Sequence, residues 1–164
     1  MSTNTAQNTA QTLKESEKKW GKEAIAAGFT VFPNILLAKQ HALGLDCYHL
    51  VIILQIHKHW WHAANAPFPS QVQLAKTMNT DRATVKRKLA ELRDLGFITW
   101  TERKTKHGGR AANAYDLSGL IAHVKKFAIE ELEDRAKRAD ERKALNQRKR
   151  PSLRIVRDED SADE

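Results

Sequence analysis

The 164-residue sequence has one cysteine and no long apolar run. A single cysteine excludes a disulfide framework within the chain. Cys47 lies in an apolar run without an activating base nearby, so we interpret it as a small buried residue and not as a nucleophile. No apolar run reaches the roughly 18 residues that span a bilayer, and no signal peptide opens the chain. We expect a cytoplasmic protein without a membrane partner.

The residue patterns of enzyme active sites are also missing. We find no paired carboxylates, no serine or cysteine nucleophile with a base, and no phosphate-binding glycine loop. His57, His59 and His62 lie close together in the sequence, but only the last two share a helix face, and no further ligand follows at metal-site spacing. We therefore predict that the protein is not an enzyme and has no catalytic residue, metal site or cofactor.

Negative charge is scarce outside the C-terminal end. The net charge is +8, and five acidic residues lie in residues 158–164, so residues 1–157 carry +13. Residues 70–110 contain ten lysines and arginines and four acidic residues. Such an excess favours a polyanionic partner, namely nucleic acid. The alternative is a well-solvated surface, in which both signs would be interspersed.

The chain before residue 70 is expected to hold a polar tail and three helices. Residues 1–14 have almost nothing to bury and are predicted to be disordered. Helices are predicted from residue 14 to 27 and from Pro33 to Gly44, with a short extended segment between them. The next helix, about 47–62, is apolar almost all round and should be the central core helix, with Asp46 as its cap.

Residues 70–96 encode two helices joined by a tight turn. Ser70 and Gln73 form a capping box at the first helix, and Asn79 suits a left-handed residue at its end. The apolar residues expected to be buried in this helix are Val72, Leu74, Ala75 and Met78. Asp81 can cap the second helix, and Gly96 can end it.

The second helix has a core-facing stripe and a basic outer face. Val85, Leu89 and Leu92 recur at intervals of four and three, which places them on one buried side. The opposite side is predicted to contact DNA through Arg82, Ala83, Thr84, Lys86 and Arg87.

A β-hairpin is predicted on either side of a glycine-containing loop. Residues 97–103 alternate apolar and polar side chains, and residues 111–117 return as a second strand with Tyr115 and Leu117 inward. The loop between them should contact the DNA backbone through Lys106, His107 and Arg110.

The segment before the helix pair is also expected to be extended. Residues 65–69 break the core helix and form a short extended piece, with Phe68 inward.

A long helix is expected from Ser118, its cap, to about Arg150. Its apolar residues down to Leu132 should pack on the domain, while residues 133–150 form a projecting charged helix. Such a helix could pair with a second copy or remain a solvated single helix, and the sequence leaves both open. Residues 151–164 should be a disordered acidic tail.

This order of elements predicts a winged helix-turn-helix over residues 15–132. The fold class is mainly α with a small β-hairpin, N-terminal helices and a long C-terminal helix. The second helix of the pair fits the major groove of B-DNA, about 12 Å wide, and the hairpin loop reaches the neighbouring backbone.

Several stretches also resemble a family of bacterial, plasmid and phage helix-turn-helix proteins, some of whose relatives are winged-helix domains of replication initiators. The resemblance covers residues 20–132 and departs from the pattern at Asn79, where glycine is common, and at Asp81, where serine is common. It implies winged-helix DNA binding. The stretches are WGKEAIAAGFTVFPNILLAKQHALGLD, HWW, PFPS, DRATVKRKLAELRDLGFI and GGRAANAYDLSGL.

Two roles on double-stranded DNA follow. The first is a sequence-specific transcriptional regulator, acting as a homodimer on a palindrome. The alternative is a plasmid or phage replication initiator, or an accessory factor, that binds repeated origin sites. Initiators usually carry a second winged domain, for which 164 residues leave no room, and this favours the regulator.

Overall fold

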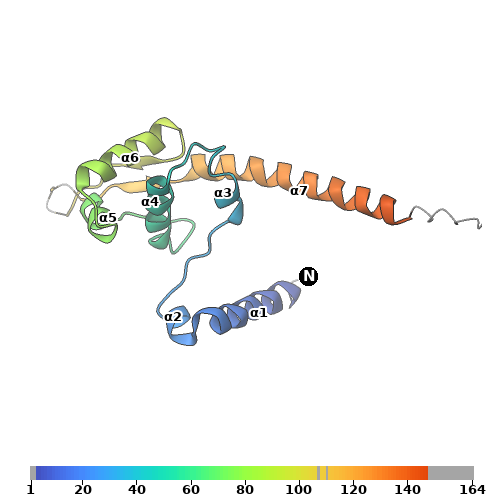
Figure 1. The fold of residues 1–164 in the computed structure, drawn as a ribbon. Coiled ribbons are helices and arrows are strands. Elements are labelled where there is room, and N and C mark those ends of the chain that lie inside the picture. Colours follow the sequence, from blue (N-terminus) through green and yellow to red (C-terminus); the bar gives the residue numbers. More distant parts are fainter. Residues whose placement is uncertain (1–2, 107, 110, 148–164) are drawn as a thin grey trace, which may run out of the picture. The chain divides into compact units, whose positions relative to one another are not determined.

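The computed structural model describes residues 3–106, 108–109 and 111–147 (Figure 1). The chain divides after Lys125 into two compact units. The elements are α1 (Thr3–Trp20), α2 (Lys22–Ala26), α3 (Asn34–Ala38), α4 (Cys47–Lys58), α5 (Gln71–Thr77), α6 (Arg82–Asp94), β1 (Thr99–Thr101), β2 (Ala114–Asp116) and α7 (Ser118–Gln147). The mainly helical fold with one small hairpin is as predicted. The order from α4 to β2 is that of a winged helix-turn-helix.

The N-terminal helices differ from their predictions. Residues 3–14, for which a disordered tail is predicted, form the first part of α1. The predicted single helix from residue 14 to 27 is interrupted at Gly21, whose φ of 86° lies in the left-handed region. The predicted helix after Pro33 ends at Ala38, and turns continue to Gly44.

The core is built on α4, as expected. Ile52, Ile53 and Ile56 are at most 1% exposed, and Asp46 caps the helix. The helix ends at Lys58, four residues before the predicted end. Cys47 is exposed and not buried, because the buried side of α4 begins two residues later, at His49.

The helix pair packs on α4 through the predicted stripe. Leu74, Val85, Leu89 and Leu92 are at most 1% exposed, and α6 lies against both α4 and α5. Two predictions about α5 need correction. Val72 is exposed, since it borders an open cavity beside Arg82 and not the core, while Met78 is only half-buried.

The hairpin packs its inner face on this core. Trp100 faces Tyr115 across the antiparallel pair of β1 and β2, and Tyr115 and Leu117 are buried as predicted. The N–H of Tyr115 donates to the carbonyl of Pro67 at 2.8 Å, so the segment before α5 runs alongside β2. Phe68 is exposed, contrary to prediction, because buried Pro67 takes the inward place and neighbouring residues of an extended segment face opposite sides.

The long helix α7 starts in the first unit and continues into the second. Leu120 in the first unit is buried, and Leu132 in the second unit is 63% exposed. Asp116 provides the carboxylate at the start of α7, accepting from the N–H and the hydroxyl of Ser118, the predicted cap, at 2.8 and 3.0 Å. Residues 148–150 and the predicted tail at 151–164 lie outside the described residues. No helix in the described part of the chain is both long and apolar enough to cross a membrane.

Two glycines bring the start of α7 against the end of α6. The N–H of Gly96 donates to Arg93 and that of Phe97 to Leu92, at 2.8 and 2.9 Å, which closes α6 with Gly96 at a φ of 74°. The N–H of Leu120 then donates to the carbonyl of Phe97 at 2.9 Å. A methyl group on Gly119 would overlap the carbonyl oxygen of Gly96. Only glycine permits this approach.

This close approach predicts that Gly119→Ala destabilises the protein by about 1–3 kcal/mol, as overpacking does. Helix propensity alone predicts the opposite sign, a gain of about 0.5–1 kcal/mol. Urea unfolding of the variant and the wild type measures the difference. A more stable variant would show that the backbones of α6 and α7 are not in contact at Gly96.

Candidate nucleic-acid interface

The turn between α5 and α6 depends on Asn79. This residue adopts a φ of 48°, as predicted, and the N–H of the following Thr80 donates to the carbonyl of Ala75 at 3.0 Å. Asparagine tolerates the left-handed region better than other residues with a side chain. The turn therefore keeps its geometry without the glycine common in such pairs.

Asp81 caps α6 and also accepts a hydrogen bond from the hydroxyl of Thr84. One carboxylate oxygen accepts from the backbone N–H of Thr84 and the other from its Oγ1, both at 2.7 Å. These bonds, led by that from the hydroxyl, hold the pKa of Asp81 below its usual value. Asp81 therefore serves the helix as a cap, as predicted.

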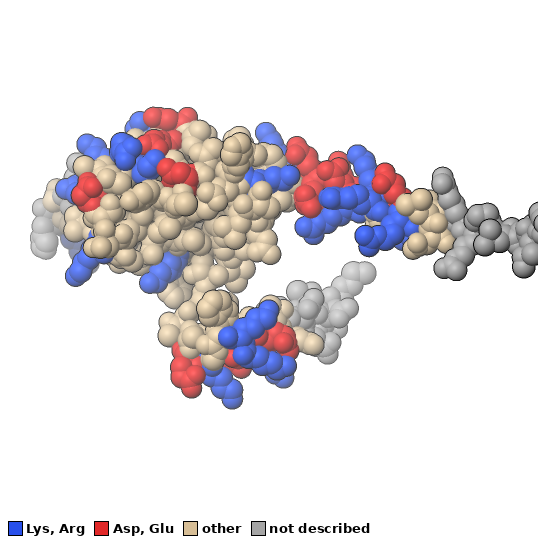
Figure 2. All heavy atoms as spheres, in the orientation of Figure 1, with Lys and Arg blue, Asp and Glu red and all other residues tan. Residues whose placement is uncertain are grey.

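Basic side chains cover the outer face of the first half of α6. Arg82, Ala83, Lys86 and Arg87 are exposed and Thr84 is half-buried, so the structure brings these predicted residues onto one surface. The Nε of Arg82 donates to Oε1 of Gln71 at 3.4 Å, the long end of the hydrogen-bond range. In Figure 2, Lys and Arg lie over the part of the molecule that contains α5, α6 and the hairpin, with acidic side chains among them.

One of the three loop residues predicted to contact the DNA backbone lies among the described residues. Lys106 is exposed, whereas His107 and Arg110 lie outside the described residues. The N–H of Thr105 donates to the carbonyl of Gly109 at 2.7 Å, and Gly108 has a φ of 79°. The loop is thus closed by its own backbone at a position that requires glycine.

A shallow cavity of about 220 Å³ separates the helix pair from the returning side of the hairpin. Its wall includes Gln71, Val72 and Arg82 on one side and Ala112 and Asn113 on the other. The exposed Val72 therefore faces the same recess as Arg82. The helix pair and the hairpin form one continuous surface.

Two arginines held against aromatic rings were not predicted from the sequence. The guanidinium of Arg103 lies 4.1 Å from the ring centre of Phe68, and that of Arg93 lies 5.4 Å from Trp100. Cation–π contacts of this kind hold a cation in place near the base of the hairpin. The alternation of the strand could have identified Arg103, since it lies two residues after the outward-facing Thr101.

One lysine of α6 is turned into the protein. Lys88 is 8% exposed, and its Nζ donates to Oδ2 of Asp46 at 2.6 Å and to Oε2 of Glu91 at 2.7 Å. The other oxygen of Glu91 lies 3.6 Å from the guanidinium of Arg87. Lys88 therefore joins the cap of α4 to the middle of α6, and its charge is not available to DNA.

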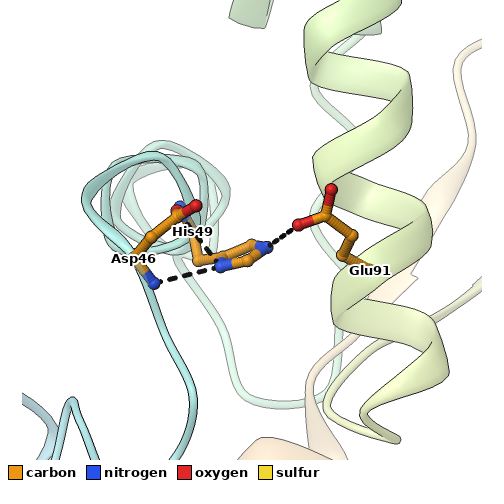
Figure 3. A group of neighbouring side chains, drawn as sticks. All are labelled: Asp46, His49 and Glu91. Carbon is orange, nitrogen blue, oxygen red and sulfur yellow. Dashed lines mark hydrogen bonds and ion pairs between the residues drawn. The ribbon is translucent and has the colours of Figure 1, made fainter.

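His49 completes this group, which we call the Lys88 cluster (Asp46, His49, Lys88 and Glu91; three members are drawn in Figure 3). His49 is 4% exposed, and its Nδ1 accepts the N–H of Asp46 at 3.1 Å. The same Nδ1 lies 3.1 Å from Oδ1 of Asp46. Nε2 lies 3.1 Å from Oε2 of Glu91 but is not aligned for a hydrogen bond.

The cluster contains the ligand types of a metal site, but its centre is occupied. Atoms of Asp46, His49 and Glu91 that could bind a metal lie within 4.8 Å of one another. The ammonium of Lys88 already contacts both carboxylates and takes the place of a cation. We therefore interpret the group as a structural ion-pair cluster.

The contacts within the Lys88 cluster shift the pKa values of Asp46, Glu91 and Lys88. Burial alone would raise the pKa of Asp46, but hydrogen bonds from Lys88 and from the N–H of His49 lower it on balance. The hydrogen bond from Lys88 also lowers the pKa of Glu91, and the two carboxylates raise the pKa of Lys88. A carboxylate with a lowered pKa stabilises the fold above its unfolded pKa, and the contribution disappears as the pH falls through its native pKa.

We predict that Lys88→Met destabilises the protein by about 1–2 kcal/mol at pH 7; the partly hydrated carboxylates keep the loss below that of a fully buried pair. The difference from wild type should shrink as the pH falls below about 4, near the unfolded pKa values of the carboxylates, and through their lowered native pKa values. Urea unfolding at pH 7 and pH 3 measures it, with exposed Lys86→Met as the matched control. A difference that is equal at both pH values would contradict the ion-pair interpretation.

Comparison with known proteins identifies a family whose model matches this chain. The chain matches the DnaD N-terminal domain over residues 32–136, from the segment before α3 into α7. No curated protein matches the sequence.

Three solved structures are similar to it. A possible transcriptional regulator from Methanosarcina mazei Go1 is 14% identical, covering 66% of this chain and 85% of its own, with a TM-score of 0.42. MarR is 24% identical, covering 68% and 79%, with a TM-score of 0.38. Another transcriptional regulator is 17% identical, covering 84% of this chain and 92% of its own, with a TM-score of 0.39.

The family match spans more than half of the sequence and confirms the predicted resemblance to winged helix-turn-helix proteins. The chain therefore belongs to the family of the DnaD N-terminal domain.

Proposed function

We propose that this protein binds double-stranded DNA sequence-specifically, with α6 in the major groove and the hairpin loop on the neighbouring backbone. The observation that carries the proposal is the exposed basic face of Arg82, Lys86 and Arg87, next to a hairpin that carries Arg103 and Lys106. B-DNA accepts a helix in a groove about 12 Å wide, where base edges are distinguishable. In this arrangement the helix contacts base edges, and the loop contacts phosphates.

The two halves of α6 support this orientation. Residues 82–87 present Arg82, Lys86 and Arg87 to solvent, whereas the second half presents only Arg93, whose guanidinium pairs with Asp94 at 2.9 Å. A reading helix in this fold contacts bases with its N-terminal residues and rests on the domain with the remainder. The division within α6 follows that scheme.

As the biological role, we propose a transcriptional regulator that acts as a homodimer in the cytoplasm and has no enzymatic activity. The alternative, a replication initiator or accessory factor, draws its support from membership of the DnaD N-terminal domain family. The two roles predict different DNA sites. A dimeric regulator binds one inverted repeat with half-sites one helical turn apart, about 34–36 Å, whereas an initiator binds an array of direct repeats.

Selection of bound sites from a random DNA pool tests both proposals. An inverted repeat supports the regulator, and an array of direct repeats supports the replication role. Recovery of no preferred sequence would contradict sequence-specific binding.

We predict that Arg82→Ala and Arg87→Ala each weaken binding to the selected site by about 1–3 kcal/mol and relax base preference there, as the loss of a bidentate base contact does. Fluorescence anisotropy with the selected site and with single-base variants measures both effects. Arg142→Ala is the matched control, because it removes the same charge from an exposed position of α7 that the proposal does not place on DNA. Wild-type affinity in both test variants would remove α6 from the groove.

The hairpin loop should contribute affinity without sequence preference. Replacing Lys106 and Arg110 together by alanine should weaken specific and non-specific binding alike. The slope of log K against log salt should also become shallower, by about 0.9 for each phosphate that the variant no longer neutralises. Binding measured over a salt series gives that slope. If it is unchanged, the loop does not contact DNA.

A further inference from the structure

A rigid segment between α4 and α5 holds an aromatic ring at the surface. Pro67 and Pro69 are buried, whereas Phe68 between them is 54% exposed. Each proline fixes its own φ, and Pro69 also restricts Phe68 to an extended backbone. The carbonyl of Pro67 accepts the N–H of Tyr115 in β2 at 2.8 Å, which ties the segment to the hairpin. The outward position of the ring is therefore fixed by the fold.

The ring borders a cavity of about 270 Å³, which we call the Phe68 cavity. Pockets for drug-sized ligands measure about 300–1,000 Å³, so this cavity suits a smaller group, such as one planar ring system. Its lining combines aromatic rings with imidazoles and side-chain amides. These residues are His59, Trp61, His62, Asn65, Phe68 and Gln73.

The mixture of groups indicates an occupant that is planar and has polar edges. The amides of Asn65 and Gln73 each offer both donors and acceptors of hydrogen bonds. An apolar side chain of a protein partner would cover these amides without pairing them, which costs free energy. A nucleobase has a face that stacks on an aromatic ring and an edge that exchanges hydrogen bonds with amides. The chemistry of the cavity therefore favours a nucleobase.

Two cations lie beside these groups. The guanidinium of Arg103 lies 4.1 Å from the ring centre of Phe68, and an arginine stacked on a ring retains donors for a phosphate. Lys76 is exposed and follows Gln73 by three residues, so the two share a face of α5. The described residues that line the cavity include no acidic side chain. This charge suits the backbone that accompanies a base in a nucleic-acid strand.

We propose that the Phe68 cavity binds an unpaired base of single-stranded DNA, which stacks on Phe68 while an adjoining phosphate contacts Arg103. Within a duplex both faces of a base are covered by its neighbours, so only an unpaired base can stack on the ring. Proteins bind single strands in this way, with aromatic rings beside a basic track for the backbone. The hairpin that carries Arg103 also belongs to the proposed duplex surface. The inference goes beyond the proposed function, which does not involve Phe68.

Fluorescence anisotropy of the full chain with two labelled strands of about 16 nucleotides tests the proposal. One strand is a thymidine oligomer, and the other has the same length and charge but lacks the base at every position. The wild type should bind the thymidine strand more tightly. Phe68→Leu should weaken binding of the thymidine strand by about 5- to 150-fold, as the loss of one stacked base does. It should change the affinity for the abasic strand far less.

Phe68→Tyr is the matched control, because it keeps an aromatic ring at the same position. It should bind both strands like the wild type. Because Phe68 is 54% exposed, both variants should also keep the melting temperature of the wild type.

Three outcomes would overturn the proposal. Equal affinity of the wild type for the two strands would show that no base is bound and would favour a protein side chain as the occupant. Equal weakening of both strands by Phe68→Leu would show that the ring only positions Arg103. Thymidine monophosphate that binds as tightly as the thymidine strand would assign the cavity to free nucleotides.

Binding of duplex DNA separates this inference from the proposed function. A wild type that prefers the thymidine strand through Phe68, but selects no duplex sequence, would contradict the proposed function and support the Phe68 cavity. Sequence-specific duplex binding without a preference for the thymidine strand over the abasic strand would contradict only the present inference.

Discussion

The orientation of α6 depends on the ammonium group of Lys88. It contacts a carboxylate at the start of α4 and another within α6, at 2.6 and 2.7 Å, and so joins the core helix to the proposed reading helix through charge. The apolar contacts of Leu89 and Leu92 hold α6 to the core but are tolerant of small rotations, because apolar burial is non-directional. The hydrogen bonds of the ion pairs are directional, so they add a fixed point of attachment on the face of α6 that the apolar stripe buries. The exposed position of Arg87, whose guanidinium lies 3.6 Å from Glu91, follows from that arrangement.

Local patterns predicted most of the helix pair and the hairpin. Asn79, Asp81 and Gly96 act through their own backbone and its nearest neighbours, so their positions in the sequence sufficed to place the turn and both ends of α6. The buried stripe of Val85, Leu89 and Leu92 was predicted for a similar reason, since helical periodicity selects one face. The same periodicity placed the basic residues opposite that stripe.

Features that depend on residues far apart in the sequence were missed. Asp46 and Lys88 are 42 positions apart, and nothing in either helix alone indicates that the lysine turns inward. Phe68 was predicted to face inward, but the pairing of Pro67 with Tyr115 sets which residues of the segment face the core. A hydrophobic side chain favours burial, but the packing of the neighbouring elements determines whether it is buried.

The cap of α6 has a consequence for what its first turn can recognise. The hydroxyl hydrogen of Thr84 is given to Asp81 at 2.7 Å, so Thr84 offers DNA only the lone pairs of its oxygen. In the major groove, adenine and cytosine present amino groups that donate, whereas guanine presents only acceptors at N7 and O6. In the proposed complex, Thr84 therefore accepts from adenine N6 or cytosine N4 and disfavours guanine, so the cap of the helix sets the polarity of a base contact.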